Sequence, residues 1–130
     1  MSPVYNGPER RKSSRIEVKF VVTYQVDKPI EVRMWVGNKE VNALMLDLSE
    51  QGMAILTKHE IPIMSSLAIK FTLINLGVDK DQQMRSMEMI GEVRYSYKED
   101  SEHRLGIFFT RISQEDKQAI VNFVGMAMNQ

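Results

Sequence analysis

Two short polar clusters carry the side chains best suited to binding an anionic, hydrogen-bonding ligand. The first is residues 9–19, ERRKSSRIEVK, where three arginines and two lysines face two glutamates, a local charge of 5 − 2 = +3. An arginine fork offers parallel donors that fit two phosphate oxygens or the O6 and N7 acceptors of guanine. The segment predicts an anion site, whereas composition alone favours a solvated basic arm or a nonspecific nucleic-acid tail.

The second cluster is the run DLSEQG at residues 47–52. The carboxylate of Asp47 can accept from the N1 and N2 donors of guanine, and the hydroxyl of Ser49 can add a further bond. Gly52 is expected to adopt a positive φ and to let a ligand come close to the backbone. Such a site rejects adenine, because its donors and acceptors would then be left unpaired.

Residues for catalysis are sparse. His59 and His103 each stand alone in a polar stretch, and neither has a second histidine or a carboxylate at metal-ligand spacing. The sequence has no cysteine, no phosphate-cradling glycine loop and no nucleophile elbow. It therefore predicts a protein that is not an enzyme and holds no metal or cofactor.

The amino-acid composition further limits the class of protein to which the chain can belong. The 130 residues are enough for one domain, and 43% of them are hydrophobic. Seventeen basic residues balance seventeen acidic ones and only 8% are aromatic, which argues against a DNA- or RNA-binding barrel. No apolar run approaches the length that crosses a bilayer, so no membrane insertion is expected. The absence of cysteine fits a reducing compartment, and we expect a cytoplasmic protein.

Several strands must position the two clusters. Residues 1–15 lack apolar periodicity and predict a flexible N-terminal arm, followed by a domain over 16–130. From Ile16 to Val26, apolar residues alternate with mostly polar ones, the period of a half-buried strand. EVRMWV and VNALML flank Gly37-Asn38 and predict a hairpin that turns at those two residues.

Three later runs, LAIKFTLINL, MEMIGEVRYSY and HRLGIFFTRI, are also typical of strands. Gly91 and Gly106 within them indicate bulges or tight bends. Ser113 precedes an acidic turn and a 3.6-residue apolar period, which predicts an N-capped helix over 114–129. The pattern predicts a mostly β fold, an antiparallel barrel of about six strands with one C-terminal α-helix. We assign to its core or wall most methionines, Met34 included, together with Trp35 and the Phe108-Phe109 pair.

The order of these motifs resembles that of the PilZ domain family. Arg11 and Arg15 form RxxxR just before the first strand, and Asp47 to Gly52 form DxSxxG about thirty residues later. GEVRYSY and HRLGIFFTRIS then precede the terminal helix, so the resemblance covers roughly residues 9–126. It implies a six-stranded antiparallel barrel that binds cyclic di-GMP, a bacterial second messenger, through both motifs.

The resemblance also implies residue roles. Arg11 and Arg15 look like the pair that grips phosphates and guanine edges, and Asp47, Ser49 and Gly52 look like the corner that meets a guanine. In the family, an arginine directly before RxxxR goes with an intercalated dinucleotide dimer. Arg10 thus implies two ligands per protein if it stacks on a base, and one if it is solvated.

The resemblance implies a signalling protein that catalyses no reaction. Binding orders the N-terminal arm, and the changed surface is presented to an unidentified downstream protein. The alternative is an adaptor with the same fold that interacts with proteins but does not bind cyclic di-GMP.

Overall fold

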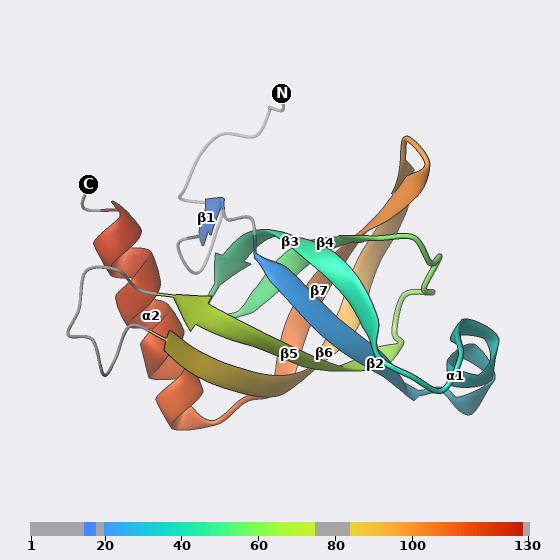
Figure 1. The fold of residues 1–130 in the computed structure, drawn as a ribbon, viewed down its shortest axis with the longest axis horizontal. Coiled ribbons are helices and arrows are strands. Elements are labelled where there is room, and N and C mark those ends of the chain that lie inside the picture. The colour runs from blue at the N-terminus through green and yellow to red at the C-terminus, as the bar shows by residue number, and fades with distance from the viewer. Residues whose placement is uncertain (1–14, 18–19, 75–83, 129–130) are drawn as a thin grey trace.

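A computed structural model describes residues 15–17, 20–74 and 84–128 of the chain, in which seven strands and two helices are found. The protein is mostly β, and one long helix lies at the C-terminal end of the described chain (Figure 1). The elements are β1 (Arg15–Glu17), β2 (Val21–Lys28), α1 (Ile30–Val36), β3 (Val41–Ser49), β4 (Gly52–Thr57), β5 (Ser66–Ile74), β6 (Met84–Glu99), β7 (Glu102–Arg111) and α2 (Gln114–Met128).

Six of the strands close into an antiparallel barrel. They follow the order β3-β2-β5-β6-β7-β4, and a β3–β4 pairing closes the ring. β1 is a seventh strand that pairs with β3 alone, next to the C-terminal half of that strand. The predicted six-stranded antiparallel barrel with a C-terminal helix is therefore confirmed. The predicted arm, residues 1–15, lies outside the described residues except for Arg15, which begins β1.

The core lies inside the barrel and follows the predicted alternation. Val22, Tyr24 and Val26 are each 1% exposed, while the residues between them are more accessible. The Tyr24 hydroxyl shares a hydrogen bond of 2.7 Å with the hydroxyl of Thr57, so its polar tip is satisfied inside the barrel. Burial raises the pKa of Tyr24, and the bond to Thr57 offsets part of that rise.

The predicted hairpin around Gly37-Asn38 is wrong, because residues 30–36 form the helix α1. Val32 is buried and Val36 packs against the core, a spacing of four that belongs to one face of a helix. Gly37 ends α1 with a φ of 109°, and its amide donates to the Arg33 carbonyl at 3.0 Å. The turn thus serves as a helix C-terminus rather than a hairpin.

The aromatic and methionine assignments are partly correct. Phe109 is buried and Phe108 is half-exposed on the opposite face, as consecutive strand residues must be. Met45, Met53 and Met89 lie in the core, whereas Met34 and Trp35 do not: both face solvent on α1.

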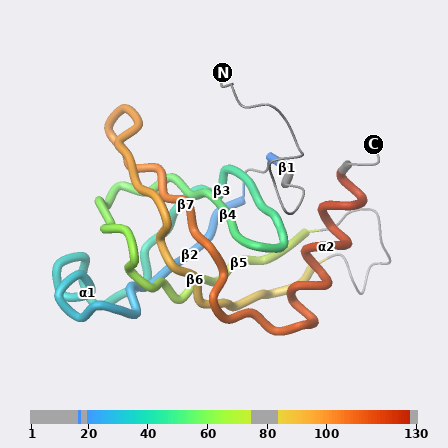
Figure 2. The backbone as a smooth tube through the Cα atoms, turned by 180° about the vertical axis from the view of Figure 1, so that it is seen from behind, coloured from blue at the N-terminus to red at the C-terminus, as the bar shows by residue number. Residues whose placement is uncertain are grey.

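The terminal helix α2 packs across one end of the barrel, opposite to α1 (Figures 1 and 2). Ile120 and Val124 are buried, and the Phe123 ring lies 5.8 Å from that of Phe20. This is the face that the 3.6-residue period predicts, although Ala127 at its end is exposed. The helix therefore closes the barrel through the side chains that the sequence indicates.

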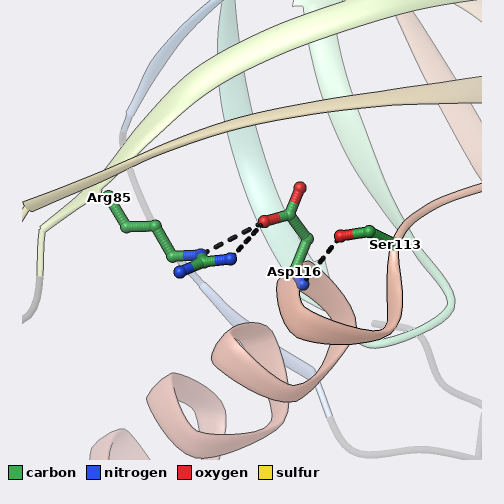
Figure 3. A network of polar contacts seen from close by, with 3 residues as sticks. All are labelled: Arg85, Ser113 and Asp116. Carbon is green, nitrogen blue, oxygen red and sulfur yellow. Dashed lines mark hydrogen bonds and ion pairs between the residues drawn. The ribbon is translucent and has the colours of Figure 1, made fainter.

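Two polar contacts fix the start of α2 (Figure 3). The Asp116 amide donates to the hydroxyl of Ser113 at 3.1 Å, which is the predicted N-cap. The Asp116 carboxylate accepts from Nε and Nη2 of Arg85 at 3.1 and 2.9 Å. Since Arg85 lies on β6, this ion pair ties the first turn of the helix to the barrel wall.

Candidate functional site

The pairing of β1, β3 and β4 brings the two sequence motifs together. Arg15 in β1 is paired with Ser49 in β3, and Ser49 is paired with Gly52 in β4. The last residue of RxxxR therefore lies at the same level of the sheet as the serine and the glycine of DxSxxG. Among the described strands, β1 is paired with β3 alone, and it also lies close to α2.

A bulge in β3 turns Asp47 and Ser49 away from the core. The register shifts between Met45 and Asp47, so that Leu46 is an extra residue relative to β4. Met45 and Leu48 consequently both point inward and are fully buried. Asp47 and Ser49, on either side of Leu48, belong to the outer face of the barrel.

Asp47 supplies a hydrogen-bond acceptor to the backbone at this bulge. Its Oδ1 accepts the amide of Ala54 at 3.1 Å, the residue with which it is paired in β4. The residue is only 9% exposed, so an amide left without an acceptor here would lose a bond that water does not readily replace. Since a carboxylate has two oxygens and about four acceptor positions, the bond to Ala54 uses only part of its capacity.

Ser49 shapes the turn between β3 and β4. Its Oγ accepts the Gln51 amide at 3.2 Å and lies 3.5 Å from the Gly52 carbonyl oxygen. The Gln51 carbonyl accepts from the amide of Phe109 at 2.8 Å, which ties the turn to β7. The corner is thus held in shape by its own side chain and by a neighbouring strand.

Gly52 is required for a different reason from the one predicted. Its φ is not positive; among the glycines that the structure describes, Gly37 alone has that conformation. A Cβ at Gly52 would lie 1.9 Å from the carbonyl oxygen of Ile107 and 3.2 Å from the Cα of Phe108. Glycine is needed because the backbones of β4 and β7 approach too closely for any side chain.

Arg104 is a residue of this face that the sequence did not indicate. Its Nη2 lies 3.8 Å from Oδ2 of Asp47, and its Nη1 lies 3.8 Å from Oε1 of Glu99. Burial lowers the pKa of Arg104, but a hydrogen bond with Tyr95 and electrostatic interactions with Tyr97, Tyr95 and, least, Asp47 raise it by more. Arg104 therefore remains a fixed cation beside the Asp47 carboxylate.

Aromatic rings extend the face beyond Arg104. Gly106 is paired with Tyr95, whose ring occupies the space that a Cβ at Gly106 would need. The rings of Tyr95 and Tyr97 are stacked with their centroids 5.9 Å apart, and Arg94 lies 4.4 Å above the Phe108 ring.

The predicted bulges are present as register shifts at Ile90/Gly91 and Val93/Tyr95. The second shift sets Tyr95 against Gly106.

Some predicted site residues remain outside this description. Arg10 and Arg11 are not among the described residues, and only the backbone position of Arg15 is given. Within the described ranges, no group of three or more His, Cys, Asp or Glu side chains is arranged to hold a metal ion. No helix in that same part of the chain is long and apolar enough to span a bilayer.

A family model supports the similarity that the motifs indicate. The model of the PilZ domain matches residues 9–125, which include both RxxxR and DxSxxG. None of the curated protein sequences matches the chain.

Solved structures share the fold. The Bacillus subtilis inhibitor of motility MotI/DgrA matches with a TM-score of 0.74 and 17% identity, over 98% of this chain and 56% of that one. The PilZ domain of Escherichia coli YcgR, solved with c-di-GMP, gives 0.60 and 16%, over 90% of each chain. Borreliella burgdorferi PlzA in complex with c-di-GMP gives 0.59 and 15%, over 88% of this chain and 40% of that one. The chain thus spans little more than half of the motility inhibitor.

Proposed function

Because the chain belongs to the PilZ domain family, we propose that it is a bacterial cytoplasmic receptor for cyclic di-GMP that passes the signal to another protein. The dinucleotide binds between RxxxR and DxSxxG. The ligand-binding residues are Arg10, Arg11, Arg15, Asp47, Ser49 and Gly52.

One observation carries this proposal, the register that sets Arg15 opposite Ser49. Arg15 ends RxxxR, and this pairing sets its backbone beside the acceptor-rich corner of residues 47–52, about thirty residues further along the chain. The YcgR and PlzA structures with the same fold contain c-di-GMP, which supports the choice of ligand. A guanine edge and a phosphate require complementary groups of these two kinds.

The side chains divide the recognition between them. Arg11 and Arg15 grip the phosphates and the O6 and N7 acceptors of guanine. Asp47 accepts from the N1 and N2 donors of guanine. The guanidinium of Arg104 lies 3.8 Å from Oδ2 of Asp47 and complements the charge of that carboxylate. Adenine lacks the N1 and N2 donors, so the site discriminates against it.

Arg10 decides the number of ligands. If its guanidinium plane stacks on a base, the site takes an intercalated dimer, and the ratio is two. If Arg10 is solvated, the ratio is one. The exposed rings on the same face, of which Tyr95 is 40% exposed, give a second base room to stack.

The signal leaves the domain through protein contacts. MotI/DgrA, which shares the fold, is described as an inhibitor of motility. We propose that ligand binding orders the residues before β1 against β3, and that the altered surface is the output. The domain then needs no catalytic residues of its own.

Calorimetric titration of nucleotide-stripped protein with cyclic di-GMP tests the proposal, with cyclic di-AMP and GTP as controls. We expect saturable binding of cyclic di-GMP alone, at a ratio of two or one according to the role of Arg10. No heat and no thermal shift at high ligand concentration would reject the receptor function. The protein would then be an adaptor of the same fold that does not bind the dinucleotide.

A further inference from the structure

The helix α1 has two apolar faces although it packs against the barrel with one. Val32 and Val36, one turn apart, pack against the barrel. Ile30 and Met34, also one turn apart, are 65% and 75% exposed, and the adjacent Trp35 is 63% exposed. A surface helix of a monomer normally has one apolar face, which packs inward, and carries polar side chains on the opposite face. The second face of α1 is therefore unexplained by the fold of one chain.

The second face is held in a fixed orientation. Oδ1 of Asn38 accepts from Nε of Arg33 at 2.8 Å and from Nε2 of Gln25 at 3.2 Å. These bonds join the end of α1 to β2, and the Val32 side chain anchors the middle of the helix. An apolar surface that is already rigid loses little conformational entropy when it is covered.

A neighbouring loop adds to this surface. Ile63 and Met64 are 56% and 72% exposed, and Met64 has a φ of 75°, unusual for a residue with a side chain. The conformation is fixed because the Met64 amide donates to the Val93 carbonyl at 2.6 Å. It places an apolar side chain in solvent in a backbone conformation that is unfavourable for an L-residue, and core packing does not compensate for this.

The helix and the loop lie at the same end of the barrel. Lys28, just before α1, is paired with Ser66, just after the loop. Both views show α1 and the segment leading into β5 at the end opposite α2 (Figures 1 and 2). We call this surface the apolar end, and it consists of Ile30, Met34, Trp35, Ile63 and Met64.

The apolar end is large enough for a specific interface. Five large side chains, each more than half exposed, offer on the order of 500 Å², near the upper limit of about 300–600 Å² for the largest apolar patch of a monomer. With a polar rim it approaches the roughly 800 Å² per partner of a standard interface.

The charges around α1 indicate which partner fits. Residues 27–40 contain three acidic and three basic side chains, so the rim is neutral. A neutral rim does not steer a strongly charged partner, but two copies related by a two-fold axis meet without repulsion and can pair opposite charges. The charged residues are Asp27, Lys28, Glu31, Arg33, Lys39 and Glu40.

We propose that the apolar end binds the apolar end of a second copy of this chain, forming a two-fold symmetric dimer. Each side chain of the patch then occurs twice in the interface. A charge introduced at Met34 is buried against apolar surface in both copies, so it weakens dimerisation strongly.

Sedimentation velocity over a wide range of protein concentrations tests this proposal, together with the emission of Trp35, the only tryptophan. We expect dimerisation with rising concentration and a parallel blue shift as Trp35 leaves water. Met34→Glu should weaken dimerisation at least tenfold. Met84→Glu is the matched control, because Met84 is also an exposed methionine, 67% accessible, but lies on β6 outside the apolar end.

Three results would overturn the proposal: a wild-type monomer at every concentration, a dimer that Met34→Glu leaves intact, or equal effects of the two variants. Circular dichroism verifies that both variants fold, which is expected because both side chains are solvent-exposed. Titration of Met34→Glu with cyclic di-GMP separates this proposal from the receptor function, since the affinity should equal that of the wild type.

Discussion

Arg15 and Ser49 lie directly opposite each other across the antiparallel pair of β1 and β3. The pairing sets the backbone of the last RxxxR residue beside the DxSxxG corner. A ligand that contacts both residues therefore bridges two strands and stabilises their pairing. Affinity and the docking of β1 are linked through this one position.

Replacing Arg15 by alanine should weaken cyclic di-GMP binding by about 10- to 100-fold. A charge-assisted hydrogen bond contributes roughly 1.5–3 kcal/mol, and each 1.4 kcal/mol changes affinity tenfold. Titration calorimetry measures the loss. Arg111→Ala is the control, an exposed arginine at the end of β7 that should leave affinity unchanged. Equal affinities of the two variants would remove Arg15 from the ligand site.

Gly52→Ala should destabilise the barrel by about 1–3 kcal/mol or more, because the new Cβ meets the backbone oxygen of Ile107 and the strands must separate. Gly125→Ala offers the matched comparison. Nothing lies within 4 Å of a Cβ at that helical position, so alanine should stabilise the protein by up to about 1 kcal/mol. Chemical denaturation measures both free energies of unfolding. Similar values for the two variants would contradict the close approach.

Asp47→Ala should lower the free energy of unfolding by about 1–3 kcal/mol, because the Ala54 amide loses its acceptor in a buried place. Asp47→Asn keeps an acceptor oxygen and should cost less, while it still removes the charge beside Arg104. We therefore expect the asparagine variant to fold well and to bind cyclic di-GMP weakly. If it binds like the wild type, Asp47 serves the fold alone.

Tyr24 should make stability fall in alkaline solution. Its pKa in the folded protein is raised above the ordinary value of 10.0, so its contribution is complete below pH 10. Above pH 10 the unfolded chain loses this proton first, and the free energy of unfolding decreases until the pH passes the raised pKa. Tyr24→Phe loses the bond to Thr57, about 1 kcal/mol at neutral pH, and should decline less steeply above pH 10. Parallel declines in denaturation experiments across this pH range would contradict the role of Tyr24.

Regular periodicity made the barrel predictable. Alternation from Val22 to Val26 and the apolar face of α2 are determined locally and survive in the structure. EVRMWV misleads because Val32, Met34 and Val36 alternate as in a strand, while Val32 and Val36 are also one helical turn apart. A six-residue apolar run fits both patterns, and tertiary packing decides between them.

Only the site residues that belong to one of the two short sequence motifs could be predicted. The sequence indicated Asp47 and Ser49, but Arg104 belongs to the same face only because β4 is paired on one side with β3 and on the other with β7. No local pattern reports such a register. The positive φ expected at Gly52 is wrong, and the close approach of β4 and β7 that requires a glycine there is a tertiary property.

Because β1 lies outside the closed ring, ligand affinity and the stability of the fold depend on different strands. The six-stranded ring is complete without β1, which pairs with β3 and also lies close to α2. Substitutions in and before this strand can therefore retune ligand sensitivity while the barrel keeps its melting temperature. A receptor of the kind proposed can change its response threshold by substitution without destabilising its fold.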